Sequence, residues 1–183
     1  MARRGQMYSV SGTLASMACS LPYAIAAQLA YPDRQSVAFV GDGGFSMLMG
    51  ELATVVKYNL PIKIIVVKNN TLGMIKMEQM LMLGNPEYGC ELQPIDFAAA
   101  AQAFGVPGFT IEDPATCGEI LEQALATPGP VVVEAVVDPN ELPMPPEIKP
   151  EQAQNIAEAL AKGQPEPEKI AETVFKVKVR EMI

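Results

Sequence analysis

Two polar turns, each placed directly after an apolar run, contain the residues whose types and spacing could do chemistry. The sequence Gly-Asp-Gly-Gly occupies positions 41–44, and Lys-Asn-Asn-Thr-Leu-Gly occupies 68–73. Two glycines let the backbone approach a ligand closely, and the N–H groups of a helix that begins there favour a phosphate. The Asp42 carboxylate would repel that phosphate unless a cation lay between them, so the first turn also predicts a metal ion.

The residue types restrict that metal to oxygen ligands. The chain has no histidine, which excludes Ser-His-Asp and Cys-His nucleophiles and histidine metal sites from within it. Asp42 and Asn69 are 27 positions apart, about one strand–helix–strand unit, so the two turns could lie side by side after neighbouring strands. A carboxylate, a side-chain amide and a backbone carbonyl suit Mg²⁺ or Ca²⁺, with phosphate oxygens and water completing the shell.

The elements that must position these turns follow from the apolar pattern. Runs rich in β-branched residues predict strands buried on both faces at 36–40, 62–67 and 131–137, with a weaker strand at 108–111. Helical spacing appears at 45–58 and 95–104, and Asp113 with Pro114 forms the N-cap and first turn of another helix. This alternation predicts an α/β fold with a doubly wound, mainly parallel sheet flanked by helices.

The ends of the chain look different from its centre. Residues 16–30 are typical of a helix interrupted near Pro22, whereas prolines become frequent after residue 138. Two helices are expected at 151–161 and 168–177, joined by a stiff hinge at 164–167. We therefore expect a cofactor-binding domain at 1–140 and a Pro-rich, helical C-terminal tail at 141–183 that packs on the domain or on a partner.

Charge and composition exclude several classes of function. Lys and Arg total 13 against 21 Asp and Glu, a net charge of −8, so the chain lacks a basic surface for nucleic acid. The three cysteines, Cys19, Cys90 and Cys117, form no C-x-x-C pair, which favours a reducing, cytoplasmic location. No signal peptide opens the chain, and no apolar run approaches the roughly 18 residues that a membrane span needs.

Gly-Asp-Gly followed at this spacing by Asn-Asn resembles the signature of thiamine diphosphate enzymes, in the domain that binds the cofactor's diphosphate. The resemblance covers roughly residues 5–155 and is most specific to pyruvate oxidases at 11–17, 21–27, 41–49 and 142–150. It implies the thiamine diphosphate-binding fold, and it implies that Mg²⁺ is held by Asp42, Asn69 and the backbone carbonyl of Thr71.

The same resemblance implies roles for the residues around the cofactor. The diphosphate would lie against backbone groups of Gly41, Gly43, Gly44, Gly73, Met74 and Ile75. Met17 resembles the bulky apolar residue beneath the cofactor that forces its bent shape, and the Ala15 carbonyl would accept a hydrogen bond from the cofactor's amino group. Glu78 matches a position in the substrate and flavin pocket.

The implied reaction is decarboxylation of a small 2-keto acid, pyruvate, followed by oxidation by a flavin (FAD). Acetolactate synthases are the alternative: they typically carry tryptophan at the position of Glu78, but Met74 is closer to the synthases than to the phenylalanine of the oxidases. The family activates its cofactor with a glutamate from a pyrimidine-binding domain of a neighbouring subunit. We therefore expect the chain to be a fragment or a subunit with little or no turnover alone, and to form a dimer or tetramer.

Simpler interpretations of the same residues remain open. Asp42 could be only an N-cap, Asn69 and Asn70 only a turn, and Met17 a core residue. Glu78 could be a solvated helix carboxylate, and the whole chain a non-catalytic module whose metal only stabilises it. For the tail we expect docking onto protein rather than onto a membrane surface.

Overall fold

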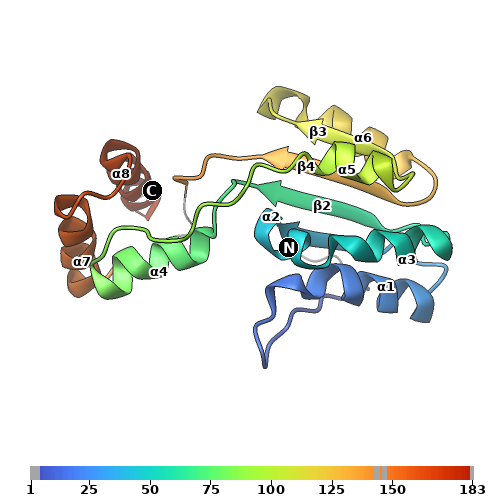
Figure 1. Cartoon of the computed structure of the whole chain (residues 1–183), viewed down its shortest axis with the longest axis horizontal. Coiled ribbons are helices and arrows are strands. Elements are labelled where there is room, and N and C mark those ends of the chain that lie inside the picture. Colours follow the sequence, from blue (N-terminus) through green and yellow to red (C-terminus); the bar gives the residue numbers. More distant parts are fainter. Residues whose placement is uncertain (1–4, 142–144, 146–147, 182–183) are drawn as a thin grey trace. The chain divides into compact units, whose positions relative to one another are not determined.

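The computed structural model describes residues 5–141, 145 and 148–181 (Figure 1). Of the segment 142–150, residues 142–144, 146 and 147 lie outside the described residues. The chain divides into two compact units. The sheet unit comprises Met1–Lys68 and Ile95–Val136, and the helical unit comprises Asn69–Pro94 and Val137–Ile183. Segment 69–94, which falls inside the expected cofactor domain, thus groups with the C-terminal helices.

The sheet unit is built on four parallel strands, which confirms the predicted α/β architecture. In chain order they are β1 (Val37–Gly41), β2 (Lys63–Lys68), β3 (Gly108–Ile111) and β4 (Val131–Val136). Their order across the sheet is β1-β2-β4-β3, and every pair is parallel. Gly41 is the register partner of Val67, so β1 and β2 end together at one edge of the sheet.

Helices pack on both faces of this sheet, as Figure 1 shows. One face carries α1 (Ser20–Ala30), α2 (Asp42–Leu48), α3 (Leu52–Lys57) and α5 (Phe97–Ala103). The core on that face joins alternate strand residues to helix residues and includes Ala38, Val40, Ile64, Val66, Val132, Leu21, Phe45, Leu52 and Phe97. The rings of Phe45 and Phe97 meet edge to face, with centroids 5.4 Å apart. On the other face α6 (Cys117–Ala126) packs against β3 and β4.

Burial on both faces holds for the centre of the sheet but is wrong for the first strand. In β1 only alternate residues are buried, whereas Val37 and Phe39 are 51% and 69% exposed. The reason is the uneven cover: the second-face helix α6 packs on β3 and β4, while β1 lies at the sheet edge. A run of β-branched and aromatic residues alone did not indicate that half-covered position.

Two helices also differ from prediction. The helix expected at 45–58 begins earlier, at Asp42, and the 3₁₀ turn η2 (Met49–Glu51) divides it into α2 and α3. The expected interruption at Pro22 is wrong, since Pro22 is the third residue of α1, where a backbone N–H has no intrahelical partner to lose. The capping prediction at Asp113 is confirmed: its carboxylate accepts from the N–H of Ala115 at 2.9 Å, ahead of η3 (Pro114–Thr116) and α6.

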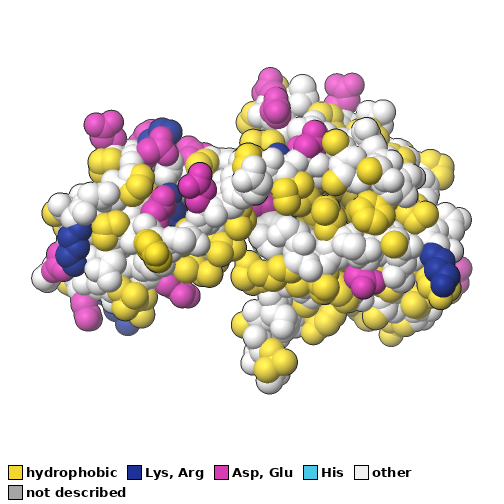
Figure 2. All heavy atoms as spheres, viewed as in Figure 1, with side chains coloured by type: hydrophobic (Ala, Val, Ile, Leu, Met, Phe, Trp, Pro, Cys, Tyr) yellow, Lys and Arg dark blue, Asp and Glu magenta, His cyan; other side chains and the backbone are white. Residues whose placement is uncertain are grey.

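The helical unit consists of α4 (Gly73–Leu83), α7 (Pro150–Ala161) and α8 (Pro167–Glu181). Its apolar core contains Met80, Leu81, Ile156, Ala159 and Ile170. Acidic and basic side chains alternate on its visible face in Figure 2, and along α8 they form ion pairs such as Glu172–Lys176 at 2.9 Å. Among the described residues, no helix is both long enough and apolar enough to cross a membrane.

Candidate functional site

The first polar turn is the start of α2. Asp42 is the first helical residue and Gly41 is the N-cap, so the interpretation of Asp42 as the N-cap residue is wrong. Its side chain is buried, at 5% exposure, and Oδ1 accepts from the N–H of Gly43 at 2.8 Å. A carboxylate held beside backbone N–H groups at the carboxyl end of a parallel strand is placed to bind a cation together with an anion.

Gly44 is required for a close approach of two backbones. A Cβ added at Gly44 would lie 2.6 Å from the carbonyl oxygen of Met17 and 3.2 Å from Cγ2 of Val40. Met17 is the first residue of the 3₁₀ turn η1 (Met17–Cys19), and its side chain is 45% exposed, so the interpretation of Met17 as a core residue is wrong. The glycine-rich turn therefore positions Met17 directly, by letting its backbone pack against α2.

The segment that leads to Met17 has an unusual backbone. Ala15 adopts a left-handed conformation with φ +48°, which a residue with a Cβ rarely adopts. The N–H of the next residue, Ser16, donates to Oγ of Ser11 at 3.0 Å and so holds this loop in shape. A residue with a Cβ stays in this conformation only where the surrounding chain holds it there.

The second polar turn lies in the helical unit and is held by its own side chains. Oδ1 of Asn69 accepts from the N–H of Thr71 at 3.0 Å, and Asn70 is left-handed with φ +54°. Thr71 faces Glu91 in an antiparallel bridge whose hydrogen bonds are made by the neighbours, Leu72 to Cys90 and Leu92 to Asn70. In such a pair each residue's own carbonyl points away from the partner strand. The carbonyl of Thr71 therefore does not point toward the segment that contains Glu91.

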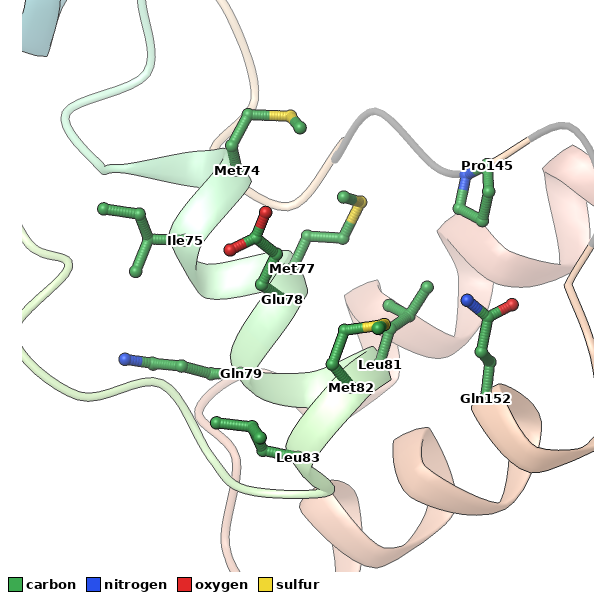
Figure 3. A pocket seen from close by; sticks show the side chains of 10 residues that line it. All are labelled: Met74, Ile75, Met77, Glu78, Gln79, Leu81, Met82, Leu83, Pro145 and Gln152. Atoms are coloured by element: carbon green, nitrogen blue, oxygen red, sulfur yellow. The ribbon is translucent and has the colours of Figure 1, made fainter. Parts of the chain in front are cut away.

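Helix α4 begins two residues later and carries the remaining predicted contacts. Gly73, Met74 and Ile75 form its first turn, whose N–H groups have no partner within the helix. Beside this helix lies a cavity of about 680 Å³ within the helical unit (Figure 3). Its walls are mostly apolar and include Met74, Ile75, Met77, Glu78, Gln79, Leu81, Met82, Leu83, Pro145 and Gln152.

Glu78 is the one charged side chain among the described residues that line this cavity. Figure 3 shows its carboxylate among the side chains of Met74, Ile75 and Met77. The structure thus brings Glu78 together with Met74 and Ile75 on one wall. A carboxylate in an apolar wall can orient a small polar ligand, and the exposure of Glu78 is equally that of a solvated helix carboxylate.

The donor set fits a hard cation. In the part of the chain that the structure describes, no three His, Cys, Asp or Glu side chains gather to hold a metal. Each turn by itself offers oxygen ligands, a carboxylate at Asp42 and a side-chain amide with a backbone carbonyl at Asn69 and Thr71, which are the kinds of ligand that suit Mg²⁺. Asp42 directly follows β1 and Asn69 directly follows β2, the strand next to it in the sheet. The two turns belong to different units, and each is described here by itself.

Comparison with known proteins identifies the family. Residues 1–135 match the model of the thiamine pyrophosphate enzyme, C-terminal TPP binding domain. The chain belongs to this family. As a thiamine pyrophosphate enzyme domain, it is expected to hold thiamine diphosphate, and the parallel sheet with flanking helices is the fold that the sequence predicted.

Several curated proteins are similar to this thiamine pyrophosphate enzyme domain. The putative thiamine pyrophosphate-containing protein YdaP of Bacillus subtilis is 42% identical over 158 residues, which are 86% of this chain and 27% of that protein. The pyruvate oxidase of Lactiplantibacillus plantarum is 38% identical over 139 residues, 75% of this chain and 23% of the oxidase. The acetolactate synthase large subunit of Pyropia yezoensis is 36% identical over 133 residues, which are 72% of this chain and 22% of that subunit. The chain thus spans about a quarter of each relative.

Sequence reasoning missed the buried charges of this domain. Glu134 in β4 is 3% exposed, forms an ion pair with Lys68 at 3.3 Å and accepts from the N–H of Phe97 at 2.8 Å. In the helical unit, Lys76 is 4% exposed and its Nζ contacts Asn140 at 3.1 Å. A signal was present, because Glu134 is the only charged residue in the apolar run 131–137.

Cys90, the cysteine nearest to the second turn along the chain, is not activated as a nucleophile. All three are free thiols, and Cys90 is buried. Burial raises the pKa of the Cys90 thiol, so the thiolate that would react is disfavoured at neutral pH. Lys63 is buried as well, and desolvation lowers the pKa of its ammonium group, which donates to the carbonyls of Thr127 and Gly129.

Proposed function

We propose that this domain binds the diphosphate of thiamine diphosphate through Mg²⁺, in an enzyme that oxidatively decarboxylates pyruvate. The observation that carries the proposal is the contact between Gly44 and the Met17 carbonyl. It joins the start of α2, where Asp42 is buried, to the residue that the family resemblance places beneath the cofactor. A turn that only ended a strand would not need a glycine at that position.

Each predicted ligand has a defined local support. Asp42 would bind Mg²⁺ from the first turn of α2, and Asn69 with the Thr71 carbonyl would bind it from the turn after β2. Backbone N–H groups of Gly43 and Gly44, and those of Gly73 to Ile75, would hold the diphosphate oxygens. Helix α4, at 11 residues, adds the favourable end of its dipole to the second set.

The domain's own residues would orient the cofactor rather than perform the organic chemistry. When bound, thiamine diphosphate supplies a carbanion that adds to the keto carbon and then takes up the electron pair left as CO₂ departs. Met17 would support the cofactor on its apolar side, and the carbonyl of Ala15 would accept a hydrogen bond from the cofactor's amino group. The mostly apolar walls of the cavity beside α4 would contact the substrate.

Glu78 favours the oxidase over the synthase. Acetolactate synthases typically have tryptophan at this position, and here a carboxylate lies in the wall of an apolar cavity. With FAD as the electron acceptor, Glu78 would meet substrate and flavin in that cavity. Met74, on the same wall, favours the synthase, and the similarity to acetolactate synthases over about three quarters of the chain supports the same alternative. Product analysis of the complete enzyme separates the two, since only the synthase joins two keto acids into a longer product.

The activity requires a partner that binds the pyrimidine half of the cofactor. We propose that a pyrimidine-binding domain, in the same or another chain, supplies the activating glutamate, and that the assembled protein is a dimer or tetramer. Pyruvate-dependent dye reduction by the isolated 183-residue chain would contradict this requirement. Light scattering on the chain alone tests self-association, and a monomer would contradict the expected oligomer.

Calorimetry tests the binding site itself. Thiamine diphosphate is titrated into the chain with and without Mg²⁺, and pyrophosphate is titrated as a probe of the diphosphate site alone. We expect binding that requires Mg²⁺ and is lost in Asp42→Ala, because the only predicted carboxylate ligand is removed. Asp33→Ala, which changes an exposed aspartate in the turn before β1, is the matched control and should bind normally. Binding of either ligand that is independent of both Mg²⁺ and Asp42 would refute the assignment, and Mg²⁺ binding without cofactor selectivity would favour a non-catalytic metal module.

A further inference from the structure

A largely buried ion pair lies at the end of β2, the strand that leads into the second predicted ligand segment, Asn69–Thr71. Lys68 is the last residue of β2, and its Nζ lies 3.3 Å from Oε2 of Glu134 in β4. The side chains are 12% and 4% exposed, respectively. A largely buried ion pair is seldom more stable than well-packed apolar residues of similar size, so stability alone does not account for its place at the end of β2.

Glu134 also contacts two further elements, α5 and β3. Its Oε2 also accepts from the N–H of Phe97, the first residue of α5, at 2.8 Å. Its Oε1 accepts from Oγ1 of Thr110, its register partner in β3, at 3.4 Å. One carboxylate therefore ties together the ends of two strands, a neighbouring strand and the start of a helix, all within the sheet unit.

This network stands where the chain leaves the sheet unit. The three connections to the helical unit fall after Lys68, before Ile95 and after Val136. Lys68 is the last residue before the first connection, Phe97 lies two residues beyond the second, and Glu134 lies two residues before the third. Asn69 is joined to Lys68 by a peptide bond, so fixing the Lys68 side chain restricts the direction in which the segment Asn69–Thr71 begins.

We propose that the Lys68–Glu134 ion pair is a positioning element for the metal-ligand segment Asn69–Thr71. The inference rests on the proposed function for the identity of the ligands. Neither residue touches the metal; Glu134 orients Lys68, and Lys68 fixes the start of the segment. Groups that orient metal ligands from outside the coordination shell typically contribute 10–100-fold to metal affinity.

The same strand offers a matched control. Lys63, at the other end of β2, is 3% exposed, and its Nζ donates to the carbonyls of Thr127 and Gly129, the latter at 2.8 Å. It is a buried lysine in the same strand with comparable hydrogen bonding, but no predicted ligand follows it. A general loss of stability would affect both lysine variants, whereas a positioning role belongs to Lys68 alone.

The test uses Lys68→Met, Glu134→Gln, the double variant, Lys68→Arg and Lys63→Met in the 183-residue chain. Lys68→Met leaves the Glu134 charge buried and unpaired and should unfold at lower temperature. The double variant has no buried charge, and its glutamine carbonyl can still accept from Phe97. Its thermal midpoint should therefore recover most of that loss. Calorimetry with Mg²⁺ and pyrophosphate should still show roughly 10–100-fold weaker Mg²⁺-dependent binding in the double variant, with near-normal binding in Lys68→Arg and Lys63→Met.

Hydrogen exchange gives a readout that needs no ligand. Backbone amides of residues 69–72 should exchange faster in the double variant than in the wild type and Lys63→Met. Normal binding in the double variant, or unchanged exchange at 69–72, would overturn the positioning role. Absence of Mg²⁺-dependent binding in the wild type would instead overturn the proposed function, and the exchange result would still decide whether the ion pair orders the segment.

Discussion

Replacing Gly44 with alanine tests the contact on which the proposed cofactor site depends. The new Cβ would lie 2.6 Å from the Met17 carbonyl oxygen and 3.2 Å from its carbonyl carbon. Ordinary contact begins at 3.4 Å, so the two backbones must separate by about 0.8 Å along that line. The neighbour is main chain, which cannot avoid the clash by a change of rotamer. Overpacking of this kind typically costs about 1–3 kcal/mol of the free energy of unfolding.

The intrinsic helix preference of alanine works in the opposite direction and must be measured separately. Alanine is favoured over glycine by up to about 1 kcal/mol inside a helix. Gly118→Ala is the matched control, because Gly118 also lies in the first turn of a helix, α6, and nothing lies within 4 Å of an added Cβ. The propensity gain is shared, so the difference between the two variants should approach the clash cost of about 1–3 kcal/mol.

Urea unfolding of both variants measures that difference, and calorimetry with Mg²⁺ measures its effect on the site. We expect Gly44→Ala to weaken binding of thiamine diphosphate more than that of pyrophosphate, because the displaced Met17 would contact only the larger ligand. If Gly44→Ala is as stable as Gly118→Ala, the predicted clash does not occur. If its affinity for thiamine diphosphate is also unchanged, Met17 does not support the cofactor.

The remaining predictions concern packing and buried charge. In Gly108→Ala, the added Cβ would meet the backbone of Ala98, with its Cα at 2.7 Å, so urea unfolding should show a loss of at least about 1–3 kcal/mol. Burial lowers the pKa of Lys63 below 10.5, so its charge opposes folding at neutral pH. The free energy of unfolding of the wild type, relative to that of Lys63→Met, should therefore rise as the pH approaches 10.5. If the free energies of unfolding of the two proteins change with pH in the same way, this prediction is wrong. The Asn140 side chain accepts from the buried Lys76 at 3.1 Å and donates to Glu166, the residue before α8, at 2.7 Å. Asn140→Ala should therefore cost about 1–3 kcal/mol of the free energy of unfolding and speed hydrogen exchange in the first turn of α8, and unchanged exchange there would show that Asn140 does not hold the start of this helix.

The sheet was predictable from sequence because its signal is local. Four short runs of β-branched residues, separated by helical patterns, were enough to predict four parallel strands, and each lies within a residue or two of its predicted position. The cover of each face was not predictable in the same way. Phe39 is 69% exposed because no helix of the sheet unit packs over β1 on its second face, among the residues described. The exposure of Phe39 depends on where α6 packs, and the local sequence of β1 does not indicate that position.

The helix starts show a similar limit. The sequence predicted a helix from residue 45 with a glycine-rich turn before it, whereas α2 begins at Asp42 and both glycines are helical. Glycine is unfavourable inside a helix, so propensity alone argued for the later start. The close approach to Met17 explains why residue 44 is nevertheless a glycine, since only a residue without a Cβ fits there. The same contact is the part of the site that propensity could not predict.

The buried charges carry this reasoning one step further. The two turns were predicted from residue types that bind phosphate and metal, and such types are visible in a sequence. Lys68 and Glu134 belong to neither turn, and their spacing of 66 residues shows no pattern. Their relation exists only because β2 and β4 are neighbours in the sheet. The proposed site therefore contains two kinds of residue. A sequence motif can indicate the ligand residues, whereas only the folded sheet brings the orienting residues together. Substitutions of the orienting residues should alter the affinity for Mg²⁺ while leaving every motif intact. Their effect must therefore be judged from the strand order rather than from the motif.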